Sequence, residues 1–295
     1  MSPEPQKLER VHRGRVPLPE VSGLSTSYGG DSALLVAVGD DRVSLALTTV
    51  TSGGVVGEWT VITASDVNAS SDGGAFRQLE AAELDGAGRV WVLTEENSRL
   101  AGVDIHARQV IGAARLDTST IPELHASWTS DDASRGEGLL LLRRGHLLVA
   151  KEKDPAGLVE FGPPGHGAQG VSLDTVLGSG EAFSLHGDGV LVALAWWPLT
   201  GRTAQEMHDL SDIAPDHVGG VWLLSDQSRC AAQLTLPLSP GSAVETTGVI
   251  HLPHKIDKPE GLAFLPGGLI AVSDDRHDDA DNFWVFRCST EPGRG

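Results

Sequence analysis

The chain carries a spaced acidic repeat that constrains its fold more than any other feature. An acidic residue is followed eight positions later by glycine and fifteen positions later by a second acid. Between them the sequence reads as an apolar run, a glycine turn and a second apolar run. This pattern indicates a β-hairpin repeated along the chain with its acids in register. The triplets are Glu80, Gly88 and Glu95; Glu137, Gly145 and Glu152; and Glu260, Gly268 and Asp275.

Weaker copies of the repeat occur elsewhere in the chain. Glu181 and Gly189 keep the first two positions and have Trp196 at the third. Another copy has its last acid one residue early, at Asp226, and an outline copy begins near Ser22. Repeats of this length are typical of propellers, whose four-stranded blades take about 40–50 residues. We therefore expect a single all-β domain over residues 1–295, a six-bladed β-propeller with units starting near residues 22, 80, 137, 181, 212 and 260.

The last unit contains only three strand-like runs before the chain ends. A ring of blades must protect its last sheet edge from solvent. The segment between Gln6 and Pro17 precedes the first unit and is free to supply a strand. We expect this N-terminal strand to close the ring.

Composition and charge restrict the partners of the chain. The net charge of −18 disfavours binding to nucleic acid and to anionic membranes. The charged N-terminus does not resemble a secretory signal, and Cys230 and Cys288 make no disulfide framework. We expect a cytoplasmic protein with an unknown oligomeric state, whose partner is a small molecule of polar or cationic character.

The acids at the first repeat position are the candidate metal ligands. The first strand of each blade lines the channel, so these acids converge on one channel mouth. Converging carboxylates must protonate, pair with bases or bind a cation, and Ca²⁺ takes six to eight oxygen ligands. In a structural alternative, each carboxylate accepts backbone N–H groups of the neighbouring blade, and the two roles can coexist on different blades. The candidates are Glu80, Glu137, Glu181, Asp212 and Glu260.

Antiparallel pairing returns the last repeat position to the same mouth. The side chains there, with their neighbours, form the candidate substrate-binding set. Lys151 has the alternative of forming surface ion pairs, and the two tryptophans have the alternative of packing against the next blade. The set comprises Glu95, Lys151, Glu152, Trp196, Trp197, Asp226, Asp275 and Arg276.

Two histidines are candidate catalytic bases, since imidazole exchanges protons near neutral pH. His125 lies in a long connection that enters the third unit, and His277 lies beside the predicted mouth. The alternative for a lone histidine is a structural or merely exposed side chain.

Three segments resemble a known family. The stretch HDLSDIAPDHVGGVWLLSDQSRCAAQLTL at 208–236, KPEGLAFLPGGLIAVSDD at 258–275, and EGLLLLRRGHLLVAKEKDPAGLVEF are similar to SdiA-regulated domain proteins. The likeness covers roughly residues 78–287. It implies a propeller related to esterase-like phytases and, more distantly, to gluconolactonases and paraoxonases. The last two hold a catalytic Ca²⁺ with Glu, Asn and Asp side chains at inner-strand starts; the matching positions here carry no Asn.

The sequence therefore predicts a divalent-cation-dependent propeller enzyme acting on a small molecule, with an ester, lactone or phosphoester as substrate. The metal would polarise the substrate oxygen and activate water. The alternative is a non-catalytic propeller that binds a small molecule, peptide or protein on the same face.

Overall fold

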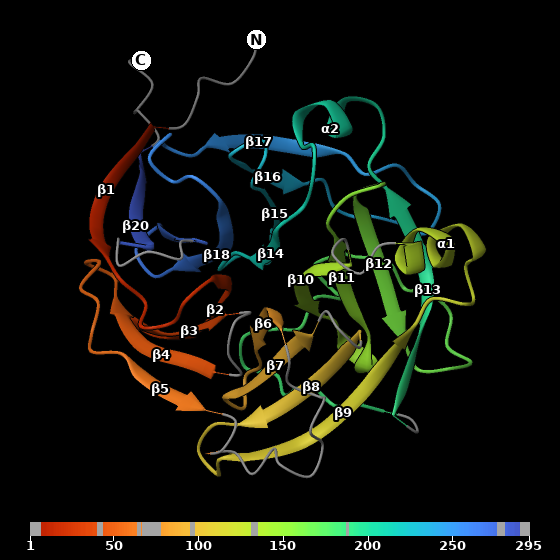
Figure 1. Cartoon of the computed structure of the whole chain (residues 1–295), viewed down its shortest axis with the longest axis horizontal. Helices are drawn as coiled ribbons and strands as arrows, with labels where there is room; N and C mark the ends of the chain where they lie inside the picture. Colours follow the sequence, from red (N-terminus) through yellow and green to blue (C-terminus); the bar gives the residue numbers. More distant parts are fainter. Residues whose placement is uncertain are drawn as a thin grey trace.

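The computed structural model describes residues 7–39, 44–63, 66, 78–94, 98–130, 135–186, 189–275 and 281–289. The fold is all-β, with antiparallel four-stranded units arranged around a central axis (Figure 1). Each unit runs outward from an inner strand beside the axis, as in a β-propeller.

The first two units follow one another along the chain with simple up-and-down order. Unit 1 consists of β2 (Val21–Gly29), β3 (Ser32–Gly39), β4 (Ser44–Thr51) and β5 (Thr60–Thr63). Unit 2 consists of β6 (Leu79–Leu84), β7 (Arg89–Thr94), β8 (Arg99–Asp104) and β9 (Gln109–Asp117).

The next two units keep this order. Unit 3 consists of β10 (Gly136–Leu141), β11 (Leu147–Lys151), β12 (Gly157–Gly162) and β13 (Val190–Pro198), with the short 3₁₀ turn η4 (Arg143–Gly145) between its first two strands. Unit 4 consists of β14 (Asp212–Pro215), β15 (Val221–Ser225), β16 (Cys230–Leu234) and β17 (Thr246–His251).

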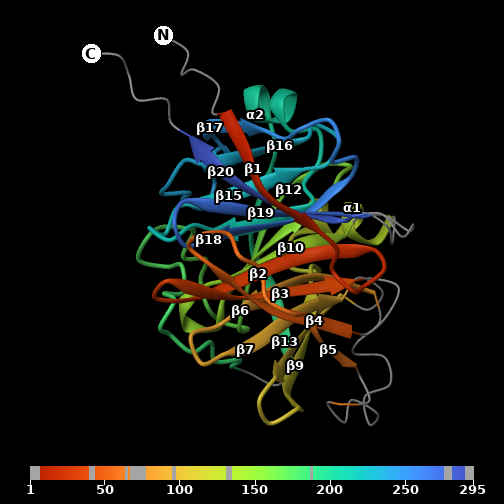
Figure 2. The same cartoon turned by 90° about the vertical axis from the view of Figure 1, so that its left-hand side faces the viewer.

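Unit 5 combines the two ends of the described chain. It contains β18 (Pro259–Leu265), β19 (Leu269–Asp274) and β20 (Phe283–Ser289), and β1 (Lys7–Gly14) pairs antiparallel with β20 as its outermost strand. Figure 2 shows β1 lying along this outer edge. The N-terminal segment therefore pairs with the three-stranded last unit in the way the sequence suggests.

The structure describes five units, not the six that we expected. The inner strands contact one another in the cyclic order β2, β6, β10, β14, β18 and back to β2. The unit expected near residue 181 is absent, because residues 181–186 form no strand. The apolar run after Gly189 instead becomes β13, the outer strand of unit 3. A peripheral strand and an inner strand can both be continuous apolar runs, so periodicity alone does not separate the two.

A long connection between β12 and β13 replaces the missing unit. It crosses the end of the ring where the first two strands of each unit are joined by turns, which we call the turn face. There Gly86 donates its N–H to the carbonyl of Glu181 at 2.7 Å, in the β6–β7 turn of unit 2. β13 then returns to unit 3 and also pairs parallel with β9, which joins units 2 and 3 into one eight-stranded sheet. We call residues 163–186 the crossing segment.

Two short helices lie on the periphery, α1 (Pro122–Ser130) and α2 (Gly201–Glu206) (Figure 1). Within the described residues, neither they nor any other helix has the length and apolar character needed to cross a membrane.

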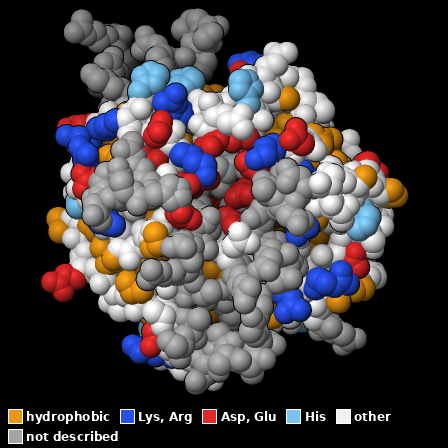
Figure 3. Space-filling model, viewed as in Figure 1, with side chains coloured by type: hydrophobic (Ala, Val, Ile, Leu, Met, Phe, Trp, Pro, Cys, Tyr) orange, Lys and Arg blue, Asp and Glu red, His pale blue; other side chains and the backbone are white. Residues whose placement is uncertain are grey.

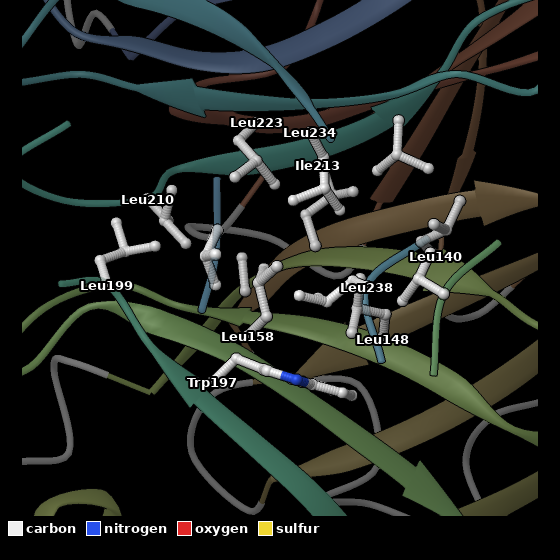
Figure 4. Close-up of a cluster of buried hydrophobic side chains, with 14 of the residues drawn as sticks. Leu140, Leu148, Leu158, Trp197, Leu199, Leu210, Ile213, Leu223, Leu234 and Leu238 are labelled. Atoms are coloured by element: carbon white, nitrogen blue, oxygen red, sulfur yellow. The ribbon is translucent and has the colours of Figure 1, made fainter. Parts of the chain in front are cut away.

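The hydrophobic core is divided among the gaps between neighbouring units. Figure 4 shows one such cluster, in which Leu158 and Trp197 of unit 3 pack against Ile213 and Leu223 of unit 4. Comparable clusters fill the other four gaps. Because each cluster has walls from two units, no single unit can bury its apolar faces alone.

Inner strands approach one another closely beside the axis. A Cβ atom built on Gly138 of β10 would lie 2.6 Å from the backbone nitrogen of Ile213 in β14. One built on Gly261 of β18 would lie 2.9 Å from the backbone nitrogen of Leu24 in β2. The glycine that follows the acid in the Glu-Gly pairs is therefore required by backbone packing.

We predict that Gly138→Ala destabilises the protein by about 1–3 kcal/mol, because the added methyl group forces two inner strands apart. The melting temperature should fall by roughly 2–4 °C for each kcal/mol. Gly167→Ala is the matched control, since a Cβ there meets nothing within 4 Å. Equal melting temperatures for the two variants would contradict this packing constraint.

Candidate functional site: the acidic mouth

Acidic side chains gather in a central hollow on one face of the ring, with lysine and arginine side chains around it (Figure 3). At the inner-strand starts of units 3 to 5, the contacts between side chains define a group that we call the acidic mouth. It consists of Glu152, Asp209, Asp226, Lys258, Glu260 and Asp275.

The predicted return of the last repeat position to the start of its hairpin is confirmed at two units. The N–H of Glu152 donates to the carbonyl of Arg135, and that of Asp275 donates to the carbonyl of Lys258, both at 3.0 Å. The acids at repeat positions one and three therefore share one end of the ring.

The first-position acid of each complete repeat lies in a β-bulge. The strand register shifts by one residue at Glu80, Glu137 and Glu260, so each is the extra residue of its bulge. Ser22 occupies the same place in unit 1. A bulged residue leaves the regular alternation and can point along the strand toward the mouth.

Unit 4 corrects the predicted register by one residue. In the register of its hairpin, Asp212 of unit 4 occupies the position that Gly261 occupies in unit 5. The residue before it, Ser211, is therefore the equivalent of Glu260. Asp226 then follows Ser211 by fifteen residues, as in the complete repeats. The acid that looked one residue early is in register, and Asp212 lies one step deeper along the axis.

Asp212 accepts backbone N–H groups, which is the structural role that the sequence analysis left open as an alternative to metal binding. Its Oδ2 accepts the N–H of Leu262 in the next inner strand, at 2.8 Å. Its Oδ1 accepts the N–H of the following residue, Ile213, also at 2.8 Å. Burial raises the pKa of Asp212 well above its ordinary value, and the carboxyls of Glu83 and Glu260 raise it further. Asp212 therefore links units 4 and 5 through the backbone.

Lys258 organises the acids of unit 5. Its ammonium lies 2.8 Å from Glu260 Oε1 and 2.8 Å from Asp275 Oδ2. Burial opposes the charge of Lys258, but these two carboxylates outweigh it and raise the lysine pKa. The other oxygen of Asp275, Oδ1, is buried without a hydrogen-bond partner among the described residues.

Asp209 and Asp226 form a carboxyl pair. Asp209 is only 1% exposed, and its Oδ1 accepts the Ser225 hydroxyl and the N–H of Gln227. Burial raises the pKa of Asp209, and its contact with the Asp226 carboxylate raises it further. Within the described part of the chain, Asp209 Oδ2 and Asp226 Oδ1 have no hydrogen-bond donor. Two carboxylates in contact repel each other unless one carries a proton, and the raised pKa places that proton on Asp209.

Glu152 completes the mouth from unit 3. Its Oε1 accepts a hydrogen bond from Lys153 at 2.9 Å, and burial raises its pKa. Lys151 is fully buried at the end of β11 and donates to the carbonyl of Lys153. Lys153 also forms an ion pair with Glu152, and the predicted ligand contact of Lys151 stays a prediction.

Glu181 lies away from the mouth, contrary to expectation. It is on the turn face, where its Oε2 is 2.8 Å from Nε of Arg143 and also accepts the N–H of Gly178 at 2.7 Å. These two contacts lower its pKa. The loss of the sixth unit explains this displacement, since Glu181 does not begin an inner strand.

The described residues do not fit the calcium ring predicted from the sequence. A calcium site needs several oxygens converging on one point. Glu181 is at the other end of the ring, both oxygens of Asp212 accept backbone N–H groups, and Glu260 pairs with Lys258. In the part of the chain that the structure describes, no group of three His, Cys, Asp or Glu side chains is placed to hold a metal ion. We therefore derive no chemistry through a metal.

Trp196 and Trp197 lie on the outer strand β13 and pack within unit 3 and against unit 4. Trp197 is 1% exposed within the cluster of Figure 4, and its Nε1 donates to the carbonyl of Ser239 at 2.9 Å. Trp196 is half-buried on the same outer strand, β13, opposite Val159. An aromatic wall beside the acids is therefore not formed, because β13 is the strand furthest from the axis.

His125 is exposed on α1, at the periphery of the ring (Figure 1). Its Nδ1 lies 2.9 Å from the Thr118 hydroxyl, so the structure does not bring this histidine to the acidic mouth. The other predicted residues Glu95, Arg276 and His277 lie outside the described residues, so their roles stay predictions.

Two residues of the mouth were missed from the sequence. Lys258 and Asp209 each lie two residues before the bulge position, at Glu260 and Ser211. Arg135 occupies the same place before Glu137. An alignment of the repeats that began two residues earlier and matched Ser211 to Glu260 would have identified both Lys258 and Asp209.

The arrangement defines a class of protein: a β-propeller whose acids converge at one mouth of the central channel. The chain belongs to the SdiA-regulated family, which matches residues 18–275. A comparison with curated proteins finds no matching relative.

A comparison with solved structures finds neighbours of low sequence identity. A luciferin-regenerating enzyme has 10% identity and a TM-score of 0.50, over 97% of this chain and 96% of that chain. The PQQ-bound aldose sugar dehydrogenase of Streptomyces coelicolor has 13% identity and a TM-score of 0.48, over 98% and 100%. A streptogramin B lyase has 10% identity and a TM-score of 0.47, over 96% and 98%.

We predict that Asp209→Asn flattens the dependence of stability on pH. The raised pKa keeps a proton on the folded Asp209–Asp226 pair at pH values where unfolded aspartate has lost it. Stability therefore falls as pH rises above about 4, by up to about 1.4 kcal/mol per pH unit for one proton. An asparagine amide at this position would donate its N–H to Asp226 without titrating. Chemical denaturation between pH 5 and 8 measures the slope.

The exposed Glu58→Gln variant is the control for this measurement, and it should keep the wild-type slope. An unchanged slope in Asp209→Asn would show that the pair does not share a proton.

Proposed function

We propose that the acidic mouth is the active site of a small-molecule hydrolase, with an ester, lactone or phosphoester as substrate. The observation that carries this proposal is the Asp209–Asp226 pair, in which each carboxyl has one oxygen without a donor among the described residues. Two acids that share a proton offer one proton donor and one proton acceptor at the same pH.

The roles of the two acids follow from their exposure. Asp226 is the more exposed member, so it is the one that can reach substrate and water. Its carboxylate would take a proton from the attacking water and then return this proton to the leaving oxygen, while the proton of the pair stays on Asp209. Asp209 is held by Ser225 and Gln227 and would act through Asp226 as a positioning residue.

The surrounding charges suit this chemistry. Lys258 keeps Glu260 and Asp275 paired, so that the charge of unit 5 is partly balanced next to the aspartate pair. Burial of neighbouring groups strengthens electrostatic contacts with a polar substrate. A polar molecule with hydrogen-bond donors would also satisfy the remaining buried oxygen of Asp275, to which no described residue donates a hydrogen bond.

The test is a hydrolysis assay with p-nitrophenyl acetate, γ-butyrolactone and p-nitrophenyl phosphate. We expect turnover of at least one by the wild type, and a decrease in kcat of about 10²–10⁴-fold in Asp226→Asn, the range for loss of general acid–base catalysis. Glu58→Gln should keep wild-type rates. Circular dichroism would verify that each variant is folded.

Three outcomes would count against the proposal. Turnover that persists in Asp226→Asn would remove the aspartate pair from the mechanism. Binding of these compounds without turnover would favour the non-catalytic alternative. Activity lost on addition of a chelator and restored by Ca²⁺ would replace the metal-free mechanism with the calcium dependence predicted from the sequence.

A further inference from the structure

The turn face contains a cavity of about 400 Å³ at the other end of the ring from the acidic mouth. Its walls come from four sources: the inner strands of units 1 and 2, the β10–β11 turn of unit 3, the β14–β15 turn of unit 4, and the crossing segment. This volume lies within the range of pockets that bind small organic ligands.

The crossing segment is built into the fold at this place. Val176 forms a β-bridge with Leu142, and Val171 forms one with Leu238. Glu160, which is fully buried, accepts the N–H groups of Gln169 and Gly170 at 2.9 Å each. The segment is therefore held to units 3 and 4 by hydrogen bonds, and the part of it that lines the cavity has a fixed position.

Apolar surface is left uncovered at the rim. Leu173 of the crossing segment is 62% exposed, and Val218 of the β14–β15 turn is 69% exposed. The two sides of the rim approach each other, since a Cβ built on Gly219 would lie 3.0 Å from Cδ2 of Leu173. Val176, Leu177 and Pro215 extend the apolar lining inward. A bound apolar group would remove this surface from water.

Three ionisable side chains of the cavity are neutral or have partners within the protein: Glu83, Arg143 and Asp216. Glu83 lines it; its Oε2 accepts the Ser25 hydroxyl at 2.9 Å, and burial raises its pKa to about 8. At neutral pH its carboxyl is therefore a neutral donor. Arg143 is balanced by Glu181, and the Asp216 carboxylate accepts N–H groups from Val218, Gly220 and Trp222.

We propose that this turn-face cavity is a second ligand site, which binds a small uncharged organic molecule with an apolar body and a carbonyl-type acceptor oxygen. The apolar part contacts Leu173, Val176 and Leu177, and the oxygen accepts a hydrogen bond from Glu83. This site shares no residue with the acidic mouth.

The test uses Prodan, an uncharged fluorophore with a naphthalene body and one carbonyl group, whose emission shifts to the blue in apolar surroundings. We expect saturable 1:1 binding to the full chain at pH 7. Binding should weaken severalfold as pH rises above 8, because ionised Glu83 no longer donates. Ser179→Trp fills the cavity from its exposed rim and should weaken binding by about tenfold or more.

The matched control is Val55→Trp, which adds the same side chain at an exposed site outside the cavity lining. It should leave Prodan binding within twofold of the wild type, and so should Asp209→Asn in the acidic mouth. Absence of saturable binding, or equal binding by Ser179→Trp and wild type, would overturn the proposal. Failure of the hydrolase assay would leave this outcome unaffected, because the two tests concern opposite faces.

Discussion

The structure depends on the close approach of inner-strand backbones around the axis. Gly138 and Gly261 have no room for a side chain, because the next inner strand lies directly against them. This contact brings neighbouring units near enough to share hydrophobic clusters, each of which needs walls from two units. It also places the preceding residue, the bulged Glu137 or Glu260, at the same end of the ring in each unit. Packing at the axis and acidity at the mouth are thus consequences of one repeated dipeptide.

Acidic side chains gathered near the axis repel one another, and the protein relieves this repulsion in different ways at different depths. At the mouth, Lys258 pairs with two carboxylates, and Asp209 shares a proton with Asp226. One step deeper, Asp212 accepts backbone N–H groups of two strands. Deeper still, Glu83 is protonated near neutral pH because it is buried. Ion pairing, proton sharing and backbone hydrogen bonding therefore coexist along a short channel.

The two ends of the ring are chemically different because of the crossing segment. Without it, the turn face would consist only of short links between strands. With it, Glu181 binds Arg143 and apolar side chains enclose a cavity beside the β14–β15 turn. The chain thereby has a charged mouth at one end and a cavity with apolar and polar lining at the other. The same departure from the repeat explains why the described fold has five units and two dissimilar faces.

Local sequence is enough to predict the hairpin repeat, the convergence of Glu152, Glu260 and Asp275, and the pairing of the N-terminal segment with the last unit. These features depend on turn spacing and on short apolar runs, which adjacent residues encode. The number of units, the register of unit 4 and the partners of each acid depend on packing between distant segments. An outer strand such as β13 has a sequence as apolar as that of an inner strand, although only every second residue of β13 is buried. Likewise, whether a carboxylate meets Lys258, a backbone N–H or another acid depends on residues far away in the chain.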